Sequence, residues 1–164
     1  MNIELEVVEI EKPDDVNVII GYSHFIKTVE DLSEILRTNV PQAKFGLAFS
    51  EASGPRLVRS DGNAPELVRL CEKNILAIGA GHSFIIMLRE AYPISVLNAI
   101  KSCQEVGSIF AATSNELTVI VARNESSAGI LGAIDGHSPI GVESEKDRQD
   151  RIKLLRDIGY KLGP

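Results

Sequence analysis

Short runs of branched apolar residues, separated by polar or glycine-containing breaks, recur along the chain and predict many strands. Residues 3–10 nearly alternate apolar and acidic side chains, which is typical of a strand with one exposed face. A Pro-Asp-Asp turn follows, and 16–22 is apolar again, so we predict that these two strands form a hairpin. Further strands are predicted at 45–49, 57–59, 108–113, 117–122 and 129–135.

Other segments place apolar residues three or four apart, which predicts helices. We expect helices from 28 to Pro41, from Pro65 to about 73, from Pro93 onward, and in the charged tail after 144. Strands and helices mix without a strict βαβ rhythm. The pattern predicts an α+β or mixed α/β fold, with one domain over residues 1–164 and a mixed β-sheet flanked by about four helices.

The most unusual break is Gly79 to Ser83, which separates the apolar runs 75–78 and 84–88, both predicted as buried strands. Glycine loses backbone entropy on folding, and a buried imidazole loses hydration unless it finds a partner. This cost indicates a site centred on His82. The ring could carry a phosphoryl group, or it could be a histidine hydrogen-bonded inside a tight strand connection.

Composition and motifs exclude several functions. The net charge is −6, from 17 basic and 23 acidic residues, and aromatic residues make up 5%, so neither broad binding of a nucleic-acid backbone nor base stacking is expected. No leader and no apolar run of membrane-spanning length is evident, so we expect a cytoplasmic protein that does not bind membranes. The P-loop, the complete dinucleotide fingerprint, zinc-ligand spacing and the Gly-x-Ser-x-Gly elbow are all missing.

Polar clusters at predicted strand ends supply the other candidates, because ligands in sheet proteins commonly bind beyond strand ends. Glu51 could hold a ribose hydroxyl pair or Mg²⁺, or be a solvated turn carboxylate. His24 is expected to be packed before a helix, and His137 to lie in a solvated loop. The clusters are 21–25, 50–54, 79–83, 113–115 and 135–138.

Six blocks of the sequence resemble the adenosine-specific kinase family. The resemblance runs from Met1 into the tail at 158–161. The blocks are 21–28 (GYSHFIKT), 44–54 (KFGLAFSEASG), 77–84 (AIGAGHSF), 92–98 (YPISVLN), 112–115 (ATSN) and 129–136 (GILGAIDG).

The resemblance implies a small, trimeric α/β protein that binds adenosine and AMP rather than ADP or ATP and carries a phosphorylated histidine, placed here at His82. The ribose would lie near Glu51, and the other polar edges of adenosine would meet Ser53, Asn98 or Asn115. Gly79, Gly81 and Ser83 would contact the phosphoryl oxygens. Mg²⁺ is compatible with phosphoryl transfer, but no metal-ligand set is evident.

Two other classes of function stay open. One is a protein that binds or senses adenosine or AMP without turnover, which the absence of a triphosphate motif favours. The other is a structural oligomer whose glycines serve only tight turns. The sequence departs from the family pattern at Asn115-Glu116, where relatives tend to have Asn-Pro, and at Ser127-Ala128-Gly129, where many have Gly-Arg-Gly. The second departure removes an arginine near a possible phosphate site.

Overall fold

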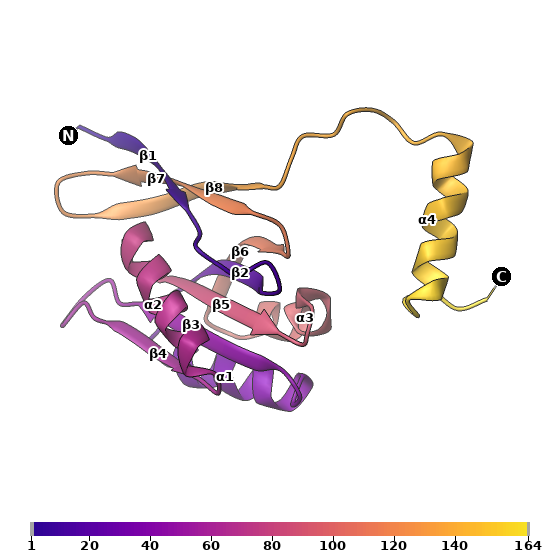
Figure 1. Cartoon of the computed structure of the whole chain (residues 1–164). Helices are drawn as coiled ribbons and strands as arrows, with labels where there is room; N and C mark the ends of the chain where they lie inside the picture. The colour runs from indigo at the N-terminus through magenta and orange to yellow at the C-terminus, as the bar shows by residue number, and fades with distance from the viewer. Residues whose placement is uncertain (1, 164) are drawn as a thin grey trace.

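Eight strands form two antiparallel sheets in the computed structural model, which describes residues 2–163 (Figure 1). The larger sheet has the order β4-β3-β5-β2-β6, and the smaller has the order β1-β7-β8. The strands of the larger sheet are β4 (Val58–Gly62), β3 (Lys44–Ser50), β5 (Ser83–Arg89), β2 (Asn17–Ser23) and β6 (Val106–Thr113). Those of the smaller sheet are β1 (Glu4–Glu9), β7 (Leu117–Arg123) and β8 (Ala128–Asp135).

Four α-helices accompany the sheets within the described residues, which confirms the predicted α+β class; the strands form two antiparallel sheets in place of the one mixed sheet that was expected. A short 3₁₀ turn, Pro93–Ser95, precedes the third helix, so the helix expected from Pro93 starts four residues later than predicted. The helices are α1 (Thr28–Asn39), α2 (Pro65–Ile78), α3 (Leu97–Lys101) and α4 (Glu145–Asp157).

The larger sheet is covered on both faces, which explains why residues 84–88 of β5 are all apolar. On one face, Leu32 and Leu36 of α1 pack with Phe45 and Phe49 of β3. On the other face lies a second core. It is formed by α2, β7 and the opposite sides of the same strands, and includes Leu67, Cys71, Ile75, Ile85, Val119 and Val121. Residues 84–88 are buried throughout.

The predicted strand at 75–78 is wrong, because these residues form the last turn of α2. The apolar stripe of α2 does not stop near residue 73: Cys71, Asn74, Ile75 and Ile78 are buried at helical spacing, whereas Leu76 is 67% exposed. Four apolar residues in a row fit a strand as well as a helix turn. Here they are helical because they continue the apolar stripe that begins earlier in α2.

The predicted N-terminal hairpin is also wrong. β1 pairs with β7 in the smaller sheet, while β2 lies between β5 and β6 in the larger one. The turn between the two strands therefore carries the chain from one sheet to the other. Alternation along 3–10 identified the strand correctly but contains no information about its partner.

The helix α4 stands apart from both sheets at the end of an extended segment (Figure 1). None of its residues is buried, although Leu154 and the following Ile158 are apolar and more than half exposed. Within residues 2–163, no helix combines the length and the apolar character needed to cross a lipid bilayer.

Candidate functional site

Antiparallel pairing divides the polar clusters between two edges of the larger sheet. β2 and β3 both run antiparallel to β5, so they end at the edge where β5 begins. This edge brings together the segments 21–25, 50–54 and 79–83. β6 runs antiparallel to β2 and ends at the opposite edge, which places 113–115 there. The five clusters therefore do not form one site.

A cavity of about 410 Å³ lies at the first edge, where β3, the end of α2 and the β7–β8 loop meet. Its volume is in the range typical of small-ligand sites. Three predicted substrate-binding residues line it: Glu51, Gly79 and Gly81. The rest of the wall is formed by Ser50, Ala52, Arg56, Val58, Ile75, Leu76 and residues 126–128.

The backbone around His82 is held in an uncommon conformation. α2 ends at Gly79, which adopts the left-handed region with φ 65°, and His82 adopts the same region with φ 61°. Such a conformation is uncommon for a residue with a side chain. The His82 N–H donates to the Ser50 carbonyl at 2.7 Å, and its carbonyl accepts from the Ser23 N–H at 2.8 Å. These two bonds join β2 and β3 through the residue that immediately precedes β5.

The imidazole of His82 lies against two aromatic rings. It stacks on Phe49, with ring centroids 6.0 Å apart and an interplanar angle of 19°, and meets the Tyr22 ring edge-on at 6.0 Å. The side chain is half-buried and does not line the cavity, whose wall contains the neighbouring Gly81. Among the described residues, the ring nitrogens have no hydrogen-bond partner, so the strand connection is held by the backbone of His82 rather than by its ring.

Glu51 uses both carboxylate oxygens to fix its own loop. One oxygen accepts from the Leu57 N–H at 2.8 Å, and the other accepts from the Arg59 guanidinium at 3.0 and 3.1 Å. The Leu57 hydrogen bond, followed by Arg59, holds the pKa of Glu51 below its ordinary value. Glu51 is therefore an ionised carboxylate in the cavity wall, and a ligand hydroxyl would share acceptors that are already in use.

One arginine lines the cavity, and a second lies beside Gly79 without lining the cavity. Arg56, with φ 54°, lines it and forms no ion pair within residues 2–163, so its guanidinium is available to an anion. Arg123 was not a predicted site residue. It forms an ion pair with Glu6 at 2.8 Å and donates to the carbonyls of Ala77 and Ile78, which end α2. Arg123 reaches this position because β7 pairs with β1 and lies against the end of α2, and no local sequence pattern predicts this contact.

The other predicted residues lie outside the cavity wall. Ser53 is exposed in the loop that contains Glu51. Ser83 is 1% exposed, and its hydroxyl donates to the Ala80 carbonyl at 2.6 Å, so this hydroxyl stabilises the turn. Asn98 is exposed on α3. Asn115, at the opposite edge, donates to Asp135 at 2.9 Å.

At that opposite edge, Asp135 joins two strands of different sheets. Its carboxylate accepts from the Thr113 hydroxyl at 2.6 Å as well as from Asn115. A second cavity, of about 580 Å³, lies nearby and is lined in part by Tyr92, Ser114 and Tyr160. The contacts of Asn115 and Asp135 are thus those of a turn between β6 and β7.

Sequence reasoning also missed a group of three side chains on the α1 face: Asp31, Cys103 and Glu105. Cys103 lies just beyond the end of α3. Burial, with the neighbouring Glu105, raises the pKa of the Cys103 thiol to about 11, so it is no nucleophile at neutral pH. Hydrogen bonding to Lys27 holds the pKa of Asp31 below its ordinary value.

These features define a small α+β protein with a ligand-sized cavity beside a glycine-flanked histidine. The family model described as adenosine specific kinase matches residues 8–161. The chain belongs to this family. Its structure is also similar to that of the PH1918 protein from Pyrococcus horikoshii OT3, with a TM-score of 0.94 and 45% identity over 99% of this chain and 100% of that one. None of the curated proteins compared with the chain matches it.

Proposed function

We propose that the protein binds adenosine or AMP in the 410 Å³ cavity and acts as a nucleoside phosphotransferase through a phosphorylated His82. One observation carries the proposal: a cavity lined by a carboxylate, two glycines and an arginine without an ion-pair partner among the described residues lies directly beside His82 in a chain of the adenosine-specific kinase family. Family membership supports an adenosine-related kinase activity. The phosphohistidine step and the individual contacts are our proposal.

The ligand would lie with its ribose toward Glu51 and its phosphate toward Arg56. A vicinal diol donates two hydrogen bonds, which suits an ionised carboxylate, and a guanidinium pairs with phosphate oxygens. Gly79 and Gly81 lie in the same wall, and Gly81 would offer its backbone N–H to a phosphoryl group, whereas the Gly79 N–H already donates to the Ile75 carbonyl at 2.9 Å. Ser53, in the Glu51 loop, could reach an edge of the base, whereas Asn98 and Asn115 would need a second binding region.

His82 has the properties required of a phosphate carrier. A neutral imidazole nitrogen is a nucleophile near pH 7, and neither nitrogen of this ring is engaged by another described residue. Transfer forms a P–N bond while the donor's P–O bond breaks, and the return step passes the phosphoryl group to a substrate hydroxyl, whose proton goes to solvent. The ring must turn from Phe49 toward Gly81 for this step.

Mass spectrometry of the intact protein tests the carrier role. Asparagine tolerates a left-handed backbone better than most residues, so His82→Asn should preserve the fold. We expect a mass increase of one phosphoryl group in protein purified from cells, retained in His24→Asn and lost in His82→Asn. Acid-labile phosphate that survives in His82→Asn would contradict the assignment.

A sensor that binds adenosine or AMP without turnover is the second candidate, and the position of the ring favours it, since His82 does not line the cavity. Calorimetry with adenosine, AMP and ATP, followed by a product assay, separates the two. Binding of the first two ligands without product in either direction would decide for the sensor.

Mg²⁺ would neutralise phosphate charge during transfer, but both oxygens of Glu51 are engaged, so we assign no Mg²⁺ ligand in this cavity. We also propose a cytoplasmic location, which the two free cysteines, Cys71 and Cys103, support because thiols persist in reducing compartments.

We further propose that the chain forms a homo-oligomer, as the resemblance to a trimeric family implies. Apolar side chains on the outer face of β1, including Leu5 and Val7, are about two-thirds exposed, and α4 contributes Leu154. Apolar surfaces of this kind are typical of contacts between subunits. A solution mass of three chains by light scattering is expected, and a monomer at micromolar concentration would contradict it.

A further inference from the structure

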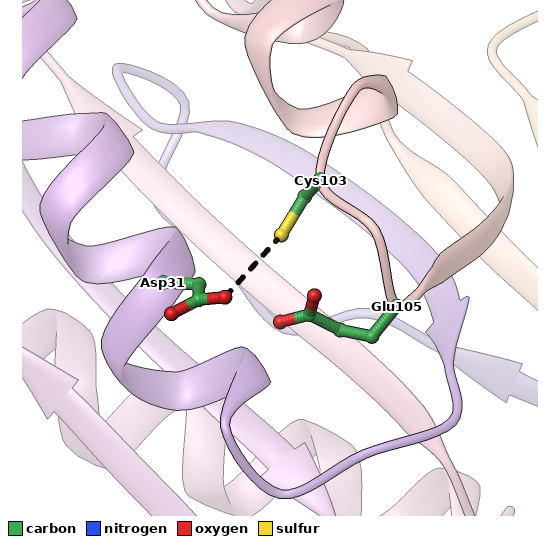
Figure 2. A group of neighbouring side chains, drawn as sticks. All are labelled: Asp31, Cys103 and Glu105. Atoms are coloured by element: carbon green, nitrogen blue, oxygen red, sulfur yellow. Dashed lines mark hydrogen bonds between the residues drawn. The ribbon is translucent and has the colours of Figure 1, made fainter.

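We infer that Asp31, Cys103 and Glu105 form a binding site for a divalent transition-metal ion of the zinc class. The three side chains come from two segments, α1 and the loop that joins α3 to β6 (Figure 2). One ligand atom from each lies within 4.8 Å of the others. The site lies on the α1 face of the larger sheet, whereas the nucleotide cavity lies at the end of α2, and it is independent of the proposed function.

Glu105 supplies the decisive observation. Its side chain is 2% exposed, and neither carboxylate oxygen has a hydrogen-bond partner among the described residues. A buried carboxylate without hydrogen bonds is costly to maintain unless a positive charge compensates it. Its carboxylate points toward the space between Asp31 and Cys103 (Figure 2). Its main-chain carbonyl is fixed by the His24 N–H at 3.1 Å.

A cation already lies at this place. The Lys27 ammonium is 2.6 Å from Asp31 and 3.8 Å from Glu105. Because this second distance is long, Lys27 compensates the negative charge of Glu105 poorly. The Lys27 side chain is 41% exposed, so it can withdraw into solvent when a doubly charged ion binds.

The ligand set favours zinc over magnesium or calcium. Metal binding displaces the proton of the Cys103 thiol into solvent, and the resulting thiolate with two carboxylates suits a borderline-soft ion, whereas Mg²⁺ and Ca²⁺ prefer oxygen alone. In tetrahedral zinc sites, neighbouring ligand atoms lie about 3.3–3.5 Å apart. The Cys103 sulfur is 4.0 Å from Asp31, so a small inward movement of side chains completes three positions and leaves the fourth to water.

Cobalt(II), which takes the same ligands, provides the test, because a cobalt–thiolate bond absorbs in the near ultraviolet. We expect the full-length protein to bind one Co²⁺ per chain with a thiolate charge-transfer band, and Zn²⁺ to abolish that band. The band should persist in Cys71→Ala, which removes the other thiol, and disappear in Cys103→Ala. A band that survives in Cys103→Ala, or its absence from wild type, would overturn the proposal.

Variants of Asp31 in α1 and of Lys27, which precedes this helix, separate a metal site from a structural ion pair. Both side chains are partly exposed, so both variants should fold, as circular dichroism would verify. Asp31→Asn should weaken Zn²⁺ binding by at least tenfold. Lys27→Met should strengthen it by about tenfold, since it removes the competing cation. If Lys27→Met leaves Zn²⁺ affinity unchanged or lower, the cluster is an ion pair and not a metal site.

Discussion

At position 82, a histidine holds a left-handed backbone between two main-chain hydrogen bonds. Ser50 and Ser23, at the ends of β3 and β2, supply their partners. A conformation of this kind persists only where the surroundings enforce it, and such positions occur frequently at functional sites. The backbone is thus fixed, whereas the ring is restrained only by packing against Phe49 and Tyr22.

The guanidinium of Arg56, which forms no ion pair with the residues that the structure describes, leads to a prediction about ligand preference. Replacing Arg56 with glutamine should weaken AMP binding by about tenfold, the value of one charge-assisted hydrogen bond, and change adenosine binding by less than about twofold. Lys44→Gln, the same charge change at the opposite end of β3, is the control. Calorimetry of both ligands with both variants measures the difference. An equal loss of both ligands would place the phosphate elsewhere.

Between elements, the contact of β3 with α2 depends on Gly46. A Cβ at this position would lie 2.3 Å from main-chain atoms of Leu67 and Val68. The helix cannot rest on the strand with any side chain there. Close approach of this kind fixes α2 against the sheet, and with it the Gly79 turn that follows.

Gly46→Ala should therefore lower the free energy of unfolding by about 3 kcal/mol or more, the upper range for overpacking. Gly132→Ala in β8, where a Cβ meets nothing within 4 Å, should change it by less than about 1 kcal/mol. Urea denaturation of both variants measures the difference, and similar values would contradict the steric account.

A second link between elements joins α1 to β4 through Asp61. It predicts that the free energy of unfolding depends on pH. Burial raises the pKa of Asp61, but the Ser33 hydroxyl, the Gly62 N–H and Arg37 outweigh it and hold the pKa below its ordinary value. The ionised form thus stabilises the fold above the unfolded-state pKa of about 3.9, and this contribution is lost as the pH falls through the lower folded-state pKa.

Comparison of wild type with Asp61→Asn by urea denaturation checks this effect. Wild type should be more stable at pH 7 by on the order of 1 kcal/mol or less, because the carboxylate is partly exposed. The difference should shrink toward zero at about pH 2–3. If the difference in the free energy of unfolding does not vary with pH, it arises from packing and not from the charge of Asp61.

The local pattern of the sequence was sufficient for most elements but not for their partners. Runs of branched residues located β5, β6, β7 and β8, and Pro65 located the start of α2. Residues 75–78 were misassigned because a short apolar run fits both a helix and a strand. The direction of strand pairing determines which candidate residues share a site. Glu51 and Gly79 lie near His82, whereas Asn115 lies at the other edge of the sheet. Glu105 was missed because nothing in its local sequence marks burial.

For the whole molecule, α4 and the extended segment before it contribute no buried residue to the rest of the chain. Ending the chain at residue 143 should therefore change the unfolding midpoint of the isolated chain little. It should lower the solution mass from oligomer to monomer. Leu154→Glu should act in the same direction, and Gln149→Glu on the exposed surface of the same helix should not. An unchanged mass after truncation would place the subunit contact elsewhere, for example on β1.

The position of β1 at the edge of the smaller sheet has a consequence for synthesis on the ribosome. Its only neighbour among the described strands is β7, and the ion pair between Glu6 and Arg123 spans 117 residues. Of the described strands, β1 therefore leaves the exit tunnel before the others but is nearly the last to find its hydrogen-bonding neighbour. Such long-range pairing slows folding and exposes apolar side chains to aggregation. The acidic residues that alternate with Leu5 and Val7 would keep this stretch hydrated until β7 has been synthesised and can pair with it.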